Sequence, residues 1–107
     1  MSEAAGGWVR VAGRDDLKAG EVIGVEAGGQ SIAVYDCDGE LFATDNICTH
    51  AYACLSDGWL DGTTIECPLH AARFDVRTGQ VLDPPATEDL KTYPVRQNGD
   101  AIEVKLA

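Results

Sequence analysis

Basic residues are missing from the middle of this 107-residue sequence. No Lys or Arg occurs between Ala19 and Ala72, whereas nine Asp or Glu do, and the net charge of the chain is −10. A surface of this charge is a poor partner for nucleic acids and anionic membranes, because their phosphates attract cationic proteins. The acidic stretch therefore either serves solubility or steers the protein toward a basic patch on a protein partner.

Long apolar stretches are also absent. The longest apolar runs are too short to cross a bilayer, and the first residues, MSEAAGGWVR, lack the basic start and apolar core of a secretory signal. We therefore expect a soluble, cytoplasmic protein that forms one domain over residues 1–107. In a reducing compartment, closely spaced Cys and His indicate metal binding rather than disulfides.

Helical periodicity is missing as well. The chain instead shows short β-prone runs, and the one weak helical signal is a possible single turn in RDDLKAG. Turn signals separate most runs, at Gly28-Gly29, Asp38-Gly39, Asp61-Gly62, Thr78-Gly79 and Asn98-Gly99. The runs are WVRV, EVIGVEA, SIAVYDC, ELFAT, TTIEC, ARFDV, QVL, KTYPVRQ and DAIEVKL. The sequence thus predicts an antiparallel all-β sandwich or small barrel.

Histidine is scarce, and both copies stand beside cysteines. The pairs are Cys48-x-His50 and Cys67-x-x-His70, separated by sixteen residues. Each pair follows a predicted strand, ELFAT or TTIEC, so both occupy loops that can meet at one tip of a sheet.

Two sulfur and two nitrogen ligands suit either zinc or an iron–sulfur cluster. Zinc knuckles usually pair like ligands within one turn, whereas each loop here pairs unlike ligands. The spacing therefore favours a Rieske-type [2Fe–2S] cluster, with Cys48 and Cys67 on one iron and His50 and His70 on the other. A structural zinc module is the alternative.

Four segments extend the match beyond these ligands: ATDNICTH, LSDGWLDG, IECPLHAARFDVRTGQVL and LKTYPV. With them, the chain resembles the Rieske ferredoxins of bacterial aromatic-ring-hydroxylating dioxygenase systems. The resemblance implies a Rieske-type antiparallel β-sandwich with two cluster-binding loops at one tip. It implies one [2Fe–2S] cluster per chain, held by Cys48, His50, Cys67 and His70.

The resemblance also implies an electron carrier that is not an enzyme. Such a carrier, a monomer in solution, receives single electrons from an NAD(P)H-dependent flavoprotein ferredoxin reductase. It passes them to a terminal oxygenase with a Rieske centre and non-haem iron. The alternative is the Rieske-like small subunit of an assimilatory nitrite reductase, which the intact ligand set disfavours.

Residues near the ligands indicate a low reduction potential. In high-potential Rieske proteins, a disulfide joins the two loops, and a Ser and a Tyr donate hydrogen bonds to cluster sulfurs. By the resemblance, Leu69, Ala72 and Phe74 stand at the corresponding positions here.

Several other residues near the motifs carry weaker expectations. Cys37 and Cys54 are expected to be free thiols, Trp59 and Phe74 to pack under the loops, and Trp8 to anchor the first strand. Tyr52 either shields the cluster or faces a partner, and Pro84-Pro85 form either a rigid loop near the cluster or a plain turn.

Overall fold

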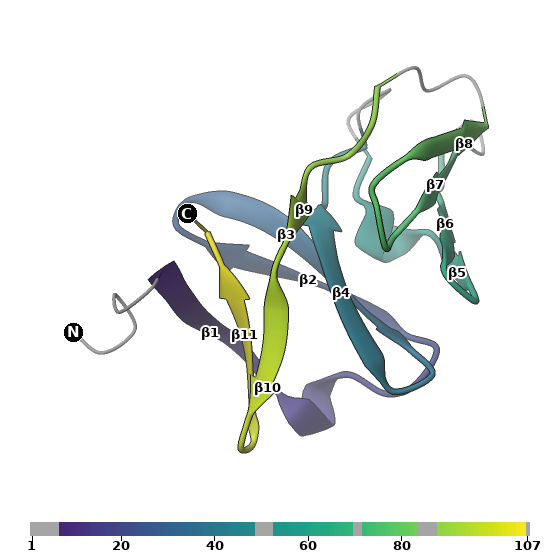
Figure 1. Cartoon of the computed structure of the whole chain (residues 1–107). Coiled ribbons are helices and arrows are strands. Elements are labelled where there is room, and N and C mark those ends of the chain that lie inside the picture. The colour runs from purple at the N-terminus through teal and green to yellow at the C-terminus, as the bar shows by residue number, and fades with distance from the viewer. Residues whose placement is uncertain (1–6, 49–52, 70–71, 84–87, 107) are drawn as a thin grey trace.

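The computed structural model describes residues 7–48, 53–69, 72–83 and 88–106. These residues form three antiparallel β-sheets, and the expected all-β architecture is confirmed (Figure 1). No helix within the described residues has the length and apolar character needed to cross a lipid bilayer.

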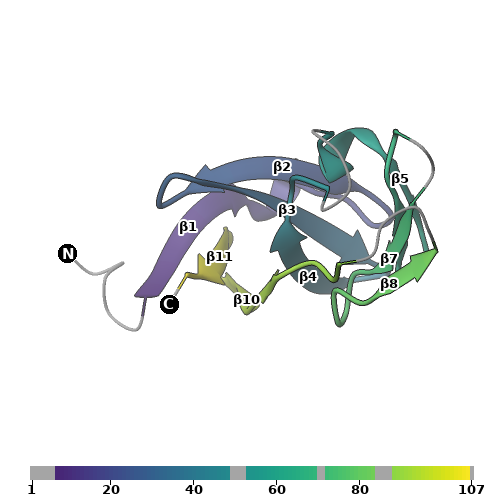
Figure 2. The same ribbon diagram turned by 90° about the horizontal axis from the view of Figure 1, so that it is seen from above.

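The first sheet has the order β1-β11-β10, and the second has the order β2-β3-β4-β9. The third sheet, β5-β6-β7-β8, lies at the opposite end of the molecule from β1, β10 and β11 (Figure 2), and we call it the loop sheet. The strands of the first two sheets are β1 (Trp8–Gly13), β2 (Val22–Ala27), β3 (Gln30–Cys37), β4 (Glu40–Asp45), β9 (Thr92–Tyr93), β10 (Val95–Asn98) and β11 (Ala101–Lys105). Those of the loop sheet are β5 (Trp59–Asp61), β6 (Thr64–Glu66), β7 (Arg73–Asp75) and β8 (Val81–Asp83).

Two short 3₁₀ turns complete the described elements: η2 (Arg14–Asp16) and η3 (Leu55–Asp57). The first lies inside RDDLKAG, where the sequence predicts a single turn. The second, and the short strand β5 that follows it, have no counterpart among the predicted elements.

The predicted turns fall between paired strands. In the β3–β4 hairpin, Cys37 pairs with Glu40, so only Asp38 and Gly39 form the turn. Their φ angles are 59° and 98°, which is the left-handed conformation that two-residue hairpins require and that Asp-Gly tolerates. Tight hairpins of this kind fix the register of the sheet and therefore the side to which each residue points.

The predicted run KTYPVRQ is divided rather than continuous. Pro94 separates β9, which pairs with β4, from β10, which pairs with β11. Because proline has no N–H to donate, it ends one ladder, and the chain crosses into the next sheet. The Pro94 carbonyl still accepts a hydrogen bond from Lys105 N at 2.9 Å.

Strand β3 is buried on both faces and separates two hydrophobic cores. Ile32 and Val34 belong to one core, whereas Ala33 and Tyr35 belong to the other, as the two-residue period of a strand requires. The body core contains Leu17, Ala27, Ile32, Val34, Ala43, Tyr93, Ile102 and Val104. The loop-side core contains Ala33, Tyr35, Cys48, Leu55, Ile65, Cys67, Ala72, Phe74, Val76 and Leu90.

Candidate metal centre

The first cysteine of the predicted site lies in a loop that is closed at its base. Ile47 and Cys54 form an isolated antiparallel bridge, and Cys48 N donates a hydrogen bond to Ala53 O at 2.9 Å. Cys48 therefore stands where the chain leaves the sheet region and enters the first predicted ligand loop. His50, the second expected ligand of this loop, lies outside the described residues.

The second cysteine occupies an equivalent position. Cys67 follows β6 directly, and its backbone N donates to Ala72 O at 2.8 Å. In both loops, the cysteine N–H thus bonds the carbonyl of the residue five positions later. His70, the remaining expected ligand, also lies outside the described residues.

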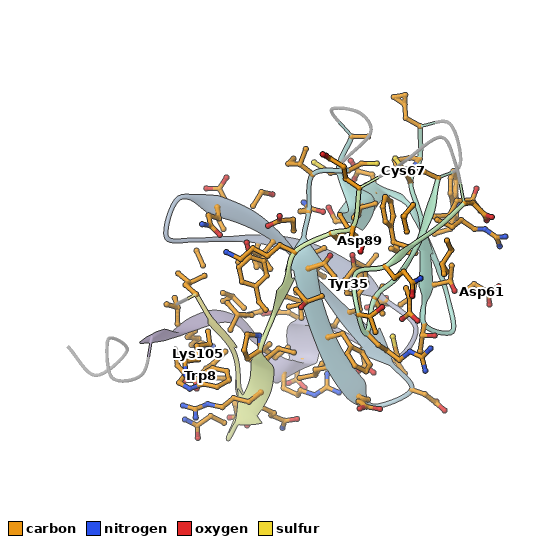
Figure 3. All side chains as sticks on the ribbon, turned by 45° about the horizontal axis from the view of Figure 1, so that its top comes forward. Trp8, Tyr35, Asp61, Cys67, Asp89 and Lys105 are labelled. Atoms are coloured by element: carbon orange, nitrogen blue, oxygen red, sulfur yellow. The ribbon has the colours of Figure 1, made fainter. Side chains whose placement is uncertain are left out.

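Both cysteines are buried in the loop-side core. Cys48 is 4% exposed and Cys67 is 0% exposed, and neither forms a disulfide. Leu69 N donates a hydrogen bond to Cys67 Sγ at 3.5 Å, which leaves the sulfur oriented toward the second loop. Figure 3 shows Cys67 in the part of the molecule formed by the loop sheet.

The environment of Cys67 favours the protonated form of its thiol. Burial raises the pKa of the Cys67 thiol, and the neighbouring Cys48 thiol raises it further, although the Leu69 N–H opposes both effects. Two adjoining buried thiols cannot both ionise at low cost. Metal binding removes this cost, because ligating thiols are deprotonated and their charge is neutralised by the metal.

The described residues fit one half of an iron–sulfur site. Two buried, unoxidised sulfur donors adjoin each other, as the thiolate side of such a site requires. Within the described ranges, no group of three or more Cys, His, Asp or Glu side chains gathers as a metal site. The remaining donors of the predicted set are therefore His50 and His70, which these ranges do not include.

A buried asparagine that the sequence pattern does not single out fixes the first loop. The Asn46 side chain is 3% exposed; its Nδ2 donates to Ser31 Oγ at 3.1 Å, and its Oδ1 accepts from Ser56 N at 2.9 Å. The Asn46 backbone also donates to Ser31 O and accepts from Leu55 N. Asn46 stands two residues before Cys48, so these bonds tie the start of the loop to β3 and η3. Asn in a segment between strands is a signal for this kind of local bonding.

The base of the site is apolar. Phe74, predicted to pack beneath the loops, is fully buried in the loop-side core, as are Ala72 and Ile65. Tyr35 reaches the same core, and its hydroxyl bonds Thr44 Oγ1 at 2.8 Å. Burial raises the pKa of Tyr35 far above its ordinary value, so this hydroxyl stays neutral.

The prediction that Trp59 packs in the core is wrong. Its side chain is 61% exposed, because the alternation of β5 turns Leu60 inward and Trp59 outward. The other exposed large apolar side chains of the described residues are Ile47, Leu69 and Leu82. All four lie on the side of the molecule formed by the loop sheet and the two loops.

The remaining predictions divide between confirmed and untested ones. Cys37 and Cys54 are free thiols, as expected. Burial, together with Asp36 and Glu40, raises the pKa of Cys37 to about 11. Trp8 lies at the start of β1 with Arg96 over its ring. Tyr52 and Pro84-Pro85 lie outside the described residues.

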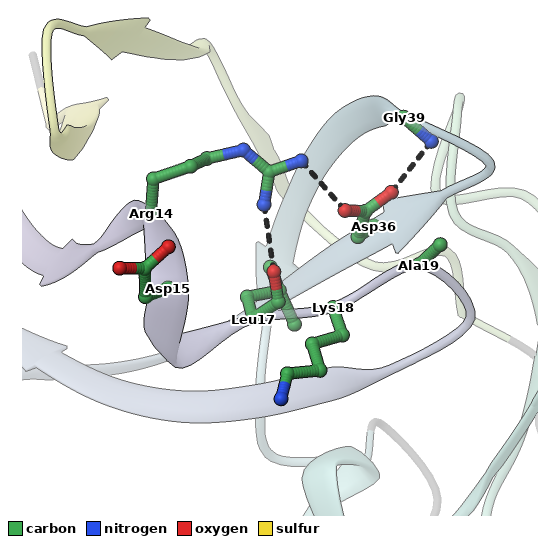
Figure 4. Close-up of a pocket in the computed structure, with 7 residues that line it drawn as sticks. All are labelled: Arg14, Asp15, Leu17, Lys18, Ala19, Asp36 and Gly39. Carbon is green, nitrogen blue, oxygen red and sulfur yellow. Dashed lines mark hydrogen bonds and ion pairs between the residues drawn. The ribbon is translucent and has the colours of Figure 1, made fainter.

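A hollow away from the loops serves the structure rather than a ligand. It has a volume of about 550 Å³ and lies between η2 and the β3–β4 turn (Figure 4). The Arg14 guanidinium there bonds Gln97 Oε1, Leu17 O and the buried carboxylate of Asp36. Its donors are thus engaged within the chain, and they hold η2 against the sheets.

Comparison with known proteins shows the family of this chain. The model of the Rieske [2Fe-2S] domain family matches residues 7–94. A ferredoxin component of naphthalene 1,2-dioxygenase/salicylate 5-hydroxylase systems from Ralstonia sp. is 50% identical, covering 92% of this chain and 95% of the relative. The ferredoxin component of a 2,4-dinitrotoluene dioxygenase system from a Burkholderia species is 46% identical, and the match covers 92% of this chain and 95% of the relative.

Solved structures show the same relationship. A Sphingomonas yanoikuyae B1 ferredoxin superposes with a TM-score of 0.87 at 40% identity, covering 92% of this chain and 98% of that chain. A chain in the complex of reduced oxygenase and oxidised ferredoxin of carbazole 1,9a-dioxygenase superposes with a TM-score of 0.87. It is 35% identical, and the match covers 94% of this chain and 94% of that chain. These relatives favour an electron-transfer ferredoxin over a nitrite reductase subunit. The chain therefore belongs to the Rieske [2Fe–2S] family, among the ferredoxins of aromatic-ring dioxygenase systems, which carry one [2Fe–2S] cluster and transfer electrons without being enzymes themselves.

Proposed function

We propose that the chain, as one Rieske domain over residues 1–107, passes single electrons from an NAD(P)H-dependent flavoprotein reductase to a terminal oxygenase. The observation that carries this proposal is the pair of buried cysteines, Cys48 and Cys67, at equivalent positions of two similarly closed loops. We further propose that the protein acts in the cytoplasm as a monomer, where a reductase supplied with NAD(P)H is available to it.

The proposed ligands are Cys48 and Cys67 for one iron and His50 and His70 for the other. When bound, the cluster would supply one-electron redox chemistry at this end of the chain. The chain contributes rigidity, because the closed loop bases and the Asn46 bonds hold the cysteines in place. The apolar base formed by Phe74 and its neighbours keeps water from the inner side of the site.

The apolar side chains at the loop end support docking of redox partners there. Ile47 precedes Cys48 and is 40% exposed, and Leu69 follows Cys67 by two residues and is 39% exposed. Exposed apolar residues beside a charged surface are typical of protein interaction sites. A partner that covers this end places its own redox centre beside the loops.

The proposal is tested with purified, cluster-loaded protein. Metal and sulfide analysis should give two irons and two acid-labile sulfides per chain, as a [2Fe–2S] cluster requires. NADH with a ferredoxin reductase should reduce the protein, and mixing with a terminal oxygenase should oxidise it again. Stoichiometric zinc without labile sulfide, or a reduced protein that no dioxygenase component oxidises, would contradict the proposal.

A further inference from the structure

The outer face of the loop sheet carries a row of side chains next to the second loop. Trp59 pairs with Glu66, Glu66 pairs with Arg73, and Arg73 pairs with Asp83. Directly paired residues of antiparallel strands point to the same face, so this row lies on one side of the sheet. The adjoining row, with Ile65 and Phe74, faces the loop-side core.

Within the described ranges, no cation lies over the indole of Trp59, although two other aromatic rings of this chain each have one. Arg96 lies over Trp8 at 4.1 Å from the ring centroid, and Lys91 lies over Tyr93 at 5.0 Å. Among the described residues, no Lys or Arg stacks on Trp59, and its ring is 61% exposed. The largest aromatic surface of the loop sheet is thus open.

The arginine on Trp8 shows which chemistry suits such a ring in this molecule. Arg96 Nε also donates to Glu103 Oε1 at 2.7 Å, so one guanidinium is held between an indole and a carboxylate from neighbouring strands. Trp59 and Glu66 present the same pair of groups on β5 and β6. No guanidinium of the described residues lies between these two groups.

Neighbouring basic side chains of the described residues do not place a cation beside Trp59 and Glu66. Arg73, the only basic residue in the row, forms an ion pair with Asp83. The Glu66 carboxylate makes no hydrogen bond or ion pair with any side chain in the described ranges. Asp61, which Figure 3 labels, lies on the same face of β5 as Trp59 and likewise has no ion pair with a described residue.

The surroundings favour a positive occupant. No Lys or Arg occurs between Ala19 and Ala72, so the sequence around the β5–β6 hairpin contributes only acidic charge. A hollow of about 490 Å³ adjoins Trp59 and is lined by Glu21, Ile23 and Leu60, among others. The carboxylate that pairs with this indole across the strands is Glu66, which lies outside the hollow. An indole beside a carboxylate matches an arginine or lysine side chain, which has an apolar stem and a cationic head.

We propose that Trp59 and Glu66 form a cation-binding contact that receives an arginine or lysine side chain of the terminal oxygenase. The inference rests on the proposed function. Glu66 immediately precedes Cys67, so an electron acceptor seated over the second loop also reaches this row. A solved complex of a 35% identical ferredoxin relative with its oxygenase shows that this class of partner binds such ferredoxins directly.

The test measures binding of cluster-loaded variants to the terminal oxygenase of a naphthalene 1,2-dioxygenase system. Trp59→Leu removes the aromatic face and Trp59→Phe retains it, and Glu66→Gln removes the charge. Trp59→Leu should weaken binding about two- to tenfold, and Trp59→Phe should restore most of the affinity. Glu66→Gln should weaken binding up to about fivefold at low salt and reduce the salt dependence of the dissociation constant.

Trp8→Leu is the matched control, because that ring already holds Arg96 and lies on the sheet opposite the loops. It should leave oxygenase affinity unchanged, and all variants should keep the visible spectrum of the wild-type cluster. The contact would be overturned if Trp59→Leu bound the oxygenase as tightly as the wild type, or if Trp8→Leu lost as much oxygenase affinity as Trp59→Leu. It would also be overturned if Trp59→Leu weakened binding to the reductase but not to the oxygenase. A wild-type chain that binds no cluster or no oxygenase would instead contradict the proposed function.

Discussion

The backbone of Gly58 lies against the carbonyl oxygen of Glu66, and a Cβ added at residue 58 would stand 2.0 Å from that oxygen. The φ of Gly58 is −90°, an ordinary value, so this glycine is required by lack of space rather than by its conformation. Since Glu66 precedes Cys67, the close approach also fixes where the second loop begins.

Gly58→Ala should therefore destabilise the protein by about 1–3 kcal/mol and loosen the cluster. Chemical denaturation gives the stability, and the rate of colour loss with an iron chelator reports the cluster. Gly62→Ala is the control, because a Cβ added there would have no atom within 4 Å and its cost comes only from a φ of +62°. A chelation rate for Gly58→Ala equal to that of Gly62→Ala would show that the approach does not position the loop.

Replacing either buried cysteine should abolish the cluster. Cys48→Ala and Cys67→Ala each remove one of the two sulfur donors of the loop-side core. His50→Ala and His70→Ala should do the same, because the chain has no spare histidine. Visible absorption and electron paramagnetic resonance of the purified variants check this. Cys37→Ala should keep the full spectrum, and an intact Rieske signal in any of the four ligand variants would refute that assignment.

The reduction potential should lie near the low end of the Rieske range, on the order of −150 mV. Phe74 and Ala72 are fully buried in the same core as Cys67 and carry no hydroxyl that can stabilise added negative charge. Phe74→Tyr should raise the potential by roughly 65–130 mV, since a hydrogen bond to a charged group contributes about 1.5–3 kcal/mol. Protein-film voltammetry measures both values. A wild-type midpoint above zero, or no shift in Phe74→Tyr, would contradict this explanation.

Asn46→Ala should weaken the first loop without removing a ligand. The change leaves the Ser56 N–H and the Ser31 hydroxyl without their partners in a buried region, at a cost of about 1–3 kcal/mol. We expect a lower denaturation midpoint and faster cluster loss to a chelator. Asn98→Ala, at the exposed end of β10, is the control and should change neither. Equal behaviour of the two variants would mean that Asn46 does not hold the loop.

Alkylation of Cys37 should depend on pH in the manner of a weakly acidic thiol. Its pKa of about 11 is raised, so the neutral thiol persists to higher pH, and only about one molecule in a thousand is thiolate at pH 8. The rate of iodoacetamide labelling, followed by peptide mass spectrometry, should rise about tenfold per pH unit between roughly pH 8 and 10. Glu40→Gln should increase the rate, because it removes a nearby negative charge that raises the pKa. A rate that stops rising before the pKa is approached would be inconsistent with this environment.

Much of this fold can be predicted from the sequence because the residues of tight turns mark where strands end. Asp38-Gly39 and Gly28-Gly29 each lie between paired strands, and alternation then assigns the faces. Both cysteines also lie at loop bases after strands, as the sequence predicts, and the structure brings Cys48 and Cys67 into one core.

Other features depend on contacts that a linear pattern does not contain. Strand β5 has three residues, too few to show a period by themselves, and its outward face is known only from its pairing with β6. For that reason hydrophobicity alone predicts the wrong environment for Trp59. Asn46 has partners fifteen and ten residues away, and only the folded chain brings Ser31 and Ser56 to it.

The two faces of β3 have a consequence for cooperativity. This one strand supplies Ile32 and Val34 to the body core and Ala33 and Tyr35 to the loop-side core. Loss of packing in either core therefore disrupts β3 and, with it, the other core. Free energy gained when the loops bind their metal therefore also stabilises the body core, because that core shares β3 with the loop-side core. Such a chain should melt in one transition whose temperature follows cluster occupancy, and backbone amides of β3 should exchange with solvent only through global unfolding.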